Sequence, residues 1–292
     1  MRRLAIAAAA LLTIGALAGC TSPPADDPRP SASPTAEATR AGVVDGTERI
    51  LVIGDSITLG TNACGAEGSC ESESWATGDD PVVESLRDRV AAQNRGAEVE
   101  ALARSGARMG SAAAALEPIV ATEPDLAIVV LGANDACGRT IADMTPVDDF
   151  AAALRAVLDA LAASPGSPAI LVMSVPDLES VWEELSRNPS ALSAWSANPA
   201  CQSLFADAHS ELPDADAGRA EVTQRIAEYN AAIAEQCGAV AGCSTDAGLL
   251  NAHRFTSDEI STVDYFHPSI TGQATISAIV WDALVAMPVS GG

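Results

Sequence analysis

The stretch "ILVIGDSITLG" at residues 50–60 decides how this chain folds. It begins with four consecutive apolar residues, which is typical of a strand buried on both faces of a parallel sheet. The apolar run then enters the polar turn Gly54-Asp55-Ser56 without a linker. The stretch therefore predicts a buried strand that presents a serine hydroxyl at its carboxyl end.

Apolar, β-branched runs alternate with helical patterns along the rest of the chain. Strands are predicted at residues 49–53, 98–103, 126–131 and 169–175. Helices are predicted at residues 81–93, 111–121, 146–163, 219–236 and 269–286, the first and third starting at Pro81 and Pro146. This alternation predicts an α/β fold, a doubly wound (flavodoxin-like) α/β/α sandwich around a mostly parallel sheet of five strands. Residues 176–218, which Pro and Asn interrupt, are expected to form an insertion above the sheet.

The N-terminus has the layout of a secretory signal. Two arginines precede an apolar run over residues 4–18 that is too short to span a bilayer. The sequence Leu-Ala-Gly-Cys at 17–20 resembles the lipobox of bacterial lipoproteins, which implies removal of residues 1–19 and lipidation of Cys20. An ordinary signal peptide followed by a chance cysteine is the alternative. Residues 20–48 are rich in Pro, Ser, Thr, Ala and Asp, which predicts a flexible tether.

Residues 49–292 have the length and apolar content of one α/β domain. The chain has 16 arginines and no lysine against 39 acidic residues, a formal charge of −23, and loss of residues 1–19 makes it two units more negative. So acidic a protein is not expected to bind nucleic acid. It also lacks a polybasic attraction to lipid, so membrane attachment would depend on Cys20 alone. We expect an exported monomer on the outer face of the cytoplasmic membrane, or a secreted one.

The chain has six cysteines besides Cys20. An even number of cysteines in an exported protein predicts disulfides. Their spacing favours Cys64 with Cys70 and Cys237 with Cys243, each closing a small loop, which leaves Cys137 to pair with Cys201. A metal site is the competing interpretation. It is disfavoured because no CxxC occurs and the three histidines show no ligand spacing, so neither a metal nor a cofactor is expected.

Polar clusters follow the predicted strands in places comparable to that of Ser56. They are Ser105-Gly106, Gly132-Ala133-Asn134-Asp135 and, before the last helix, Asp264-Tyr265-Phe266-His267-Pro268. Functional groups of parallel sheets gather outside the carboxyl ends of the strands. A serine nucleophile needs a base, a histidine base needs a carboxylate, and acyl transfer needs hydrogen-bond donors for the oxyanion. The clusters supply all of these residue types.

Taken in order, Gly54-Asp55-Ser56, Gly106, Gly132-x-Asn134-Asp135 and Asp264-x-x-His267 resemble the four blocks of the SGNH (GDSL) hydrolases. The stretches "SVPDLESVWEEL", "AWSANPACQSL" and "DYFHPSITGQA" further resemble secreted esterases of actinobacteria. This resemblance implies that Ser56 is the nucleophile, His267 the general base and acid, and Asp264 the residue that orients it. It also implies that Gly106, Asn134 and the Ser56 N–H form the oxyanion hole.

Several assignments around these blocks have alternatives. Gly110 is a rival for Gly106, and Asp177 is a second candidate carboxylate for His267. Asp55 and Asp135 are expected to be structural acceptors of backbone N–H groups. His209 and His253 are expected to be surface or loop residues. The Gly-x-Ser-x-Gly motif is absent, which argues against the α/β-hydrolase fold.

The substrate is the part that the sequence defines least. Aromatic residues make up 3% of the chain, too few for a long sugar-stacking platform, and Trp182, Trp195 and Phe205 fall within the expected insertion. They form either the core of the insertion or a wall for an acyl group. We expect a carboxylic ester hydrolase that acts on lipid or short-chain acyl esters through an acyl-enzyme. A carbohydrate O-deacetylase and a non-catalytic ligand-binding surface lipoprotein are the alternatives.

Overall fold

The computed structural model describes residues 41–198, 201–210 and 212–288. The predicted signal segment, Cys20 and most of the predicted tether lie outside these residues. Within the described ranges, no helix has both the length and the apolar character needed to cross a membrane.

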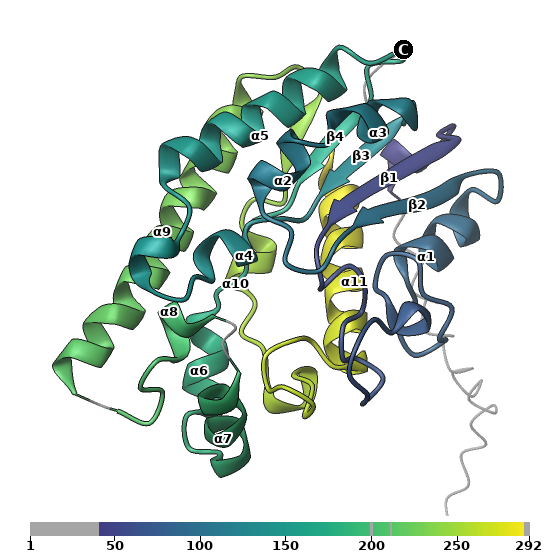
Figure 1. The fold of residues 1–292 in the computed structure, drawn as a ribbon. Helices are drawn as coiled ribbons and strands as arrows, with labels where there is room; N and C mark the ends of the chain where they lie inside the picture. The colour runs from purple at the N-terminus through teal and green to yellow at the C-terminus, as the bar shows by residue number, and fades with distance from the viewer. Residues whose placement is uncertain (1–40, 199–200, 211, 289–292) are drawn as a thin grey trace, which may run out of the picture. The chain divides into compact units, whose positions relative to one another are not determined.

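Five parallel strands form one sheet in the order β2-β1-β3-β4-β5 (Figure 1). The strands are β1 (Arg49–Gly54), β2 (Glu98–Ala103), β3 (Leu126–Val129), β4 (Ala169–Val172) and β5 (Cys243–Thr245). The central strand β3 is buried along its whole length, as its apolar sequence requires, whereas the edge strand β2 is partly exposed. The predicted doubly wound α/β fold is therefore confirmed.

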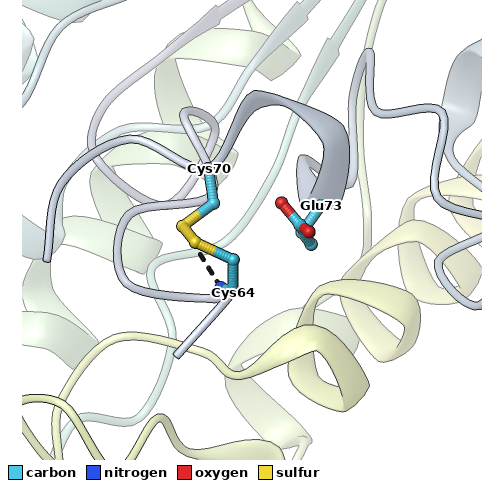
Figure 2. A group of neighbouring side chains, drawn as sticks. All are labelled: Cys64, Cys70 and Glu73. Carbon is cyan, nitrogen blue, oxygen red and sulfur yellow. Dashed lines mark hydrogen bonds between the residues drawn. A yellow bond between two sulfur atoms is a disulfide. The ribbon is translucent and has the colours of Figure 1, made fainter. Parts of the chain in front are cut away.

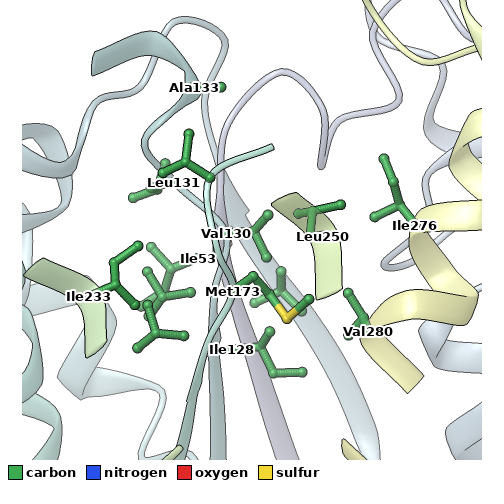
Figure 3. Packing of buried hydrophobic residues seen from close by; sticks show 14 of the residues in the cluster. Ile53, Ile128, Val130, Leu131, Ala133, Met173, Ile233, Leu250, Ile276 and Val280 are labelled. Atoms are coloured by element: carbon green, nitrogen blue, oxygen red, sulfur yellow. The ribbon is translucent and has the colours of Figure 1, made fainter. Parts of the chain in front are cut away.

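Helices cover both faces of the sheet (Figure 1). One face carries α1 (Leu86–Gln93) and α11 (Ile270–Ala286). The other carries α2 (Met109–Ala113), α3 (Leu116–Ala121), α5 (Val147–Ala162) and α9 (Pro213–Gly238). Figure 3 shows the resulting two-sided core, in which Ile233 of α9 and Val280 of α11 approach the strands from opposite sides.

Short helices and 3-10 helices complete the domain. The helices are α4 (Ala133–Ala136), α6 (Glu179–Leu185), α7 (Pro189–Ala197), α8 (Gln202–Phe205) and α10 (Leu249–Ala252). The 3-10 helices are η1 (Gly42–Val44), η2 (Glu71–Glu73), η3 (Ile141–Asp143) and η4 (Ser257–Glu259). The predicted insertion comprises α6, α7, α8 and the start of α9.

Three predicted helices differ from the observed ones. The helix predicted from Pro81 begins at Leu86, because the Ser85 hydroxyl caps it by accepting from Asp88 N–H at 3.3 Å. The helix predicted over 111–121 is split into α2 and α3. Pro118 explains the break, since it lacks an N–H and its ring clashes with the carbonyl four residues earlier. The helix predicted from 219 begins six residues earlier, with Pro213 in its first turn.

The folded domain also starts earlier than the predicted boundary at residue 49. Ala41 and Val44 are fully buried in the core, and the Gln93 amide accepts from Ala41 N at 3.0 Å and donates to its carbonyl at 2.8 Å. The last eight residues of the predicted tether therefore pack against the domain. The physical reason is the apolar pair Val43-Val44, which finds a partner surface beside α11.

Candidate active site

The turn after β1 fixes the position of Ser56. Gly54 is required there because a Cβ atom would lie 2.1 Å from Thr58 Oγ1. Ile57 N–H donates to Asp55 Oδ1 at 2.9 Å, and Thr61 N–H donates to the Ser56 carbonyl at 3.0 Å. Ser56 is therefore held in a rigid turn at the point between β1 and β3 where the strand order reverses, the usual site of binding in such sheets.

The loop between η4 and α11 brings a histidine and a carboxylate to this serine. His267 Nε2 lies 2.9 Å from Ser56 Oγ, and His267 Nδ1 lies 2.5 Å from Asp264 Oδ2. Asp264 Oδ1 accepts from the N–H groups of Phe266 and His267, both at 3.0 Å. Burial raises the pKa of Asp264, but the hydrogen bond and charge of His267 outweigh it and hold that pKa below its ordinary value. The carboxylate is thus ionised and aimed at the imidazole.

Asn134 lies beside the serine turn, on the short helix α4. Gly132 caps this helix with φ of 126°, and a Cβ atom there would lie 2.4 Å from Val175 Cγ2. The Asn134 amide donates to Asp55 Oδ2 at 2.9 Å and to the Ala107 carbonyl at 3.1 Å. Both of its hydrogens are therefore engaged, since a side-chain amide has two.

Asp55 is completely buried under this network. Burial raises its pKa to about 6, against the opposing effects of the hydrogen bond from Ile57 N–H, the charge of His267 and the amide of Asn134. Asp135 is also fully buried and accepts from Met109 N–H at 2.9 Å, and burial likewise raises its pKa. Both carboxyls contact backbone N–H groups, as expected, but Asp55 additionally contacts the amide of Asn134.

The two glycine candidates lie in different surroundings. Gly106 has φ of 72° and is exposed in the turn that follows β2, and the structure does not place it among the residues that line the pocket beside Ser56. Gly110 lies in α2 and is also exposed. The geometry thus places Ser56, Asp264, His267 and Asn134 together, with Gly106 at the margin.

A narrow pocket of about 50 Å³ opens beside Ser56 and His267. One water molecule needs roughly 10–15 Å³, so the pocket has room for a few small groups beside the hydroxyl. Figure 3 shows three of its wall residues, Val130, Leu250 and Ile276, on separate elements. The remaining apolar wall residues include Leu131, Leu178, Val181, Phe255, Ile260 and Phe266. The pocket therefore favours a small apolar group next to the hydroxyl.

The aromatic residues of the insertion form its core rather than the pocket. Trp195 stacks on Phe205 with centroids 4.4 Å apart, and Phe205 meets Phe266 edge-on at 5.6 Å. The Trp182 ring lies 3.9 Å from the guanidinium of buried Arg219. Among the described residues, none of the three insertion aromatics lines the pocket. They tie the insertion together, and Trp195 Nε1 donates to the Tyr265 carbonyl at 3.1 Å.

The alternative candidates are engaged by other partners. Asp177 lines the pocket beside Ser56, but its carboxylate pairs with Arg254 at 2.5 Å and accepts from Glu179 N–H at 3.1 Å rather than contacting His267. His253 Nε2 lies 3.1 Å from Glu259 Oε1. His209 is exposed in the loop before α9.

The structure contains the disulfides Cys64–Cys70, Cys137–Cys201 and Cys237–Cys243. Figure 2 shows the first of them with Glu73 beside it; their ligand atoms lie within 4.8 Å of one another. Both sulfurs are bonded to each other and offer no thiolate to a metal ion. The disulfide Cys137–Cys201 joins the segment after α4 to the insertion.

Sequence reasoning missed Asn62. Its side-chain amide donates to Asp264 Oδ2 at 2.9 Å across a separation of 202 residues. The only signal in the sequence is an asparagine between Gly60 and Gly65, a residue type that tolerates left-handed backbone, and φ at Asn62 is 64°.

Residues 52–275 match the sequence profile of the GDSL-like lipase/acylhydrolase family. The structure is similar to that of a variant of an acetyl xylan esterase from Geobacillus stearothermophilus (18% identity, TM-score 0.51, covering 84% of this chain and 97% of that one). It is also similar to an extracellular lipase from Streptomyces rimosus (20% identity, TM-score 0.51, covering 80% of this chain and 99% of that one). A third similar structure is that of TesA (17% identity, TM-score 0.52, covering 81% of this chain and 97% of that one). The comparison with curated proteins gave no match. At these identities the structural likeness concerns the fold.

Proposed function

The chain belongs to the GDSL-like lipase/acylhydrolase family and is a carboxylic ester hydrolase, and on this premise we propose that it hydrolyses short-chain acyl esters through an acyl-enzyme on Ser56. The observation that carries the proposal is the 2.9 Å approach of His267 Nε2 to Ser56 Oγ beside a pocket of about 50 Å³. A small pocket limits the acyl group more than it limits the alcohol, which leaves toward solvent.

The proposed reaction follows from the atoms in contact. His267 Nε2 takes the proton of Ser56 Oγ as that oxygen bonds to the ester carbonyl carbon, and Asp264 stabilises the imidazolium that forms. The tetrahedral intermediate collapses, the bond to the alcohol oxygen breaks, and Nε2 returns the proton to the leaving alcohol. Water then repeats the sequence on the acyl-enzyme, releasing the carboxylic acid and restoring Ser56.

Asn134 can donate a hydrogen bond to the oxyanion only if one of its amide hydrogens leaves its present acceptor. Its two amide hydrogens point at Asp55 Oδ2 and the Ala107 carbonyl, so one of these contacts gives way when the carbonyl oxygen of the substrate becomes negative. The backbone N–H of Ser56 and that of Gly106 are the other donors we assign. Glycine adopts the φ of 72° found at Gly106 without steric cost.

We also infer that the enzyme is exported and anchored by a lipid on Cys20. The sequence of residues 17–20 supports this, and so do the three disulfides, which persist in oxidising compartments. With no lysine in the chain, the anchor would be its main attachment to a membrane.

The test is ester hydrolysis by wild type, Ser56→Ala and the control Ser164→Ala, whose hydroxyl bonds the Leu161 carbonyl at the end of α5. We expect Ser56→Ala to be inactive and Ser164→Ala to be active. p-Nitrophenyl esters from acetate to palmitate should give a maximum at acetate to butyrate. A maximum at palmitate would refute the short-chain assignment, and a fluorophosphonate label on another residue would refute the nucleophile. Release of acetate from acetylated xylan would identify the alcohol as a carbohydrate.

A further inference from the structure

The carboxylate of Asp264 is held by a second side chain besides His267. Asn62 Nδ2 donates at 2.9 Å to Asp264 Oδ2, the same oxygen that lies 2.5 Å from His267 Nδ1. Asp264 Oδ1 is occupied by two backbone N–H groups. With four donors the carboxylate has no freedom to rotate, because each turn of its plane would break at least one charge-assisted hydrogen bond.

Asn62 is itself fixed by a small loop. Its Oδ1 accepts from Gly68 N–H at 3.0 Å, and its own N–H donates to the Gly68 carbonyl at 2.8 Å. The Ser261 hydroxyl donates to the Asn62 carbonyl at 2.7 Å. Gly68 lies inside the six-residue separation that the Cys64–Cys70 disulfide closes. The loop therefore determines which face of the Asn62 amide meets Asp264: with Oδ1 on Gly68 N–H, only Nδ2 remains for the carboxylate.

We propose that Asn62 is a positioning residue for the Ser56–His267–Asp264 relay and that the Cys64–Cys70 disulfide acts through it. This inference rests on the proposed function, because it concerns the same hydroxyl, imidazole and carboxylate. Asn62 does not touch the reacting atoms. It keeps Asp264 Oδ2 in line with His267 Nδ1, and so keeps the other ring nitrogen pointed at Ser56 Oγ.

Asn62 differs from a purely structural residue because it acts on the charged carboxylate of Asp264. Asn62 donates to the oxygen that faces the imidazole and takes up part of its negative charge. Without this donor, the oxygen is free to leave its line with the imidazole, so the loss should appear in kcat rather than in KM.

The test uses Asn62→Gly, because glycine keeps the left-handed backbone at φ of 64° while removing the amide. The matched control is Ser167→Gly, another polar left-handed residue (φ of 46°), exposed in the turn before β4. We expect Asn62→Gly to lower kcat about tenfold, the scale of a hydrogen bond to a charged group, with KM unchanged. Ser167→Gly should leave both as in wild type.

Two further arms separate positioning from folding. Asn62→Asp retains an acceptor for Gly68 N–H but has no donor for Asp264, so it should lose at least as much kcat as Asn62→Gly while keeping the loop. Replacing Cys64 and Cys70 by Ser should lower kcat in wild type but have no further effect in Asn62→Gly, because coupled residues give non-additive losses.

The outcomes separate this inference from the proposed function. Kcat of both Asn62 variants within twofold of wild type would overturn the positioning role, and additive losses would overturn the link to the disulfide. In both cases an active wild type and an inactive Ser56→Ala would leave the proposed function intact. Absence of ester hydrolysis by the wild-type enzyme would instead refute the proposed function itself.

Discussion

The buried carboxyl of Asp55 should make the free energy of unfolding fall as the pH rises, and Asp55→Asn is expected to remove this dependence on pH. The pKa of the Asp55 carboxyl is raised from 3.8 to about 6 in the fold, first by burial and against the hydrogen bond from Ile57 N–H. A shift of about two pKa units corresponds to about 3 kcal/mol. The unfolded chain ionises this carboxyl at lower pH than the fold does. Stability from this group is therefore complete below pH 3.8 and is lost as the pH rises through about 6.

The magnitude can be isolated by comparing the variant with wild type at each pH. Asparagine is neutral throughout, so the free energy of unfolding of Asp55→Asn relative to wild type should increase by about 3 kcal/mol between acid pH and pH 8. Any penalty from the altered contact with Asn134 is the same at every pH and cancels in this difference. Urea unfolding followed by tryptophan fluorescence between pH 3 and pH 8 measures it. A difference between variant and wild type that stays constant over this range would refute the reasoning.

Asn134→Ala should lower kcat by roughly 10²–10³ with little change in KM in steady-state assays, and a rise in KM alone would make Asn134 a binding residue. Replacing Cys137 and Cys201 together by Ser should reduce the free energy of unfolding by on the order of 4 kcal/mol or less. Because this disulfide ties the segment that follows Asn134 to the insertion, its loss should also lower activity at temperatures where circular dichroism still shows a folded domain. Full activity there would show that this link does not position Asn134. Ile276→Phe should reduce kcat/KM for butyrate esters more than for acetate esters, and equal losses would place the acyl group elsewhere. Cys20→Ser should abolish incorporation of labelled palmitate, whereas an unlabelled wild-type protein would refute the lipid anchor.

The sequence predicts the strands that are long, apolar runs and misses the one that is not. Residues 49–53 and 98–103 correspond to β1 and β2 within one residue. β5 consists of Cys243–Thr245, and three residues with two hydroxyls carry no apolar pattern. Its place is set by pairing with β4, a contact that no local pattern encodes. The same limit applies to α1, where the capping by Ser85 prevailed over the helix-start signal of Pro81.

The candidate site was predictable where residue type alone indicates chemistry. A serine nucleophile needs a base, and this requirement pointed to His267 as the partner of Ser56. The structure brings the two side chains to hydrogen-bond distance. The engagement of Asn134 with Asp55 was not predictable, because it depends on how two turns meet in space. Asn62 was hidden for the same reason, since its partner Asp264 lies 202 residues away and nothing around either residue marks the other.

In the proposed mechanism, the attacking Ser56 hydroxyl and the His267 imidazole that deprotonates it come from opposite ends of the domain's sequence, 211 residues apart. During synthesis the serine therefore emerges long before its base, and a serine without a base is a weak nucleophile. By this mechanism, a chain whose synthesis is unfinished, or that a protease has cut before residue 267, has no base for Ser56 and is not expected to hydrolyse esters. We therefore expect ester hydrolysis to begin only when the loop before the last helix has folded, so that its onset would report the completion of folding.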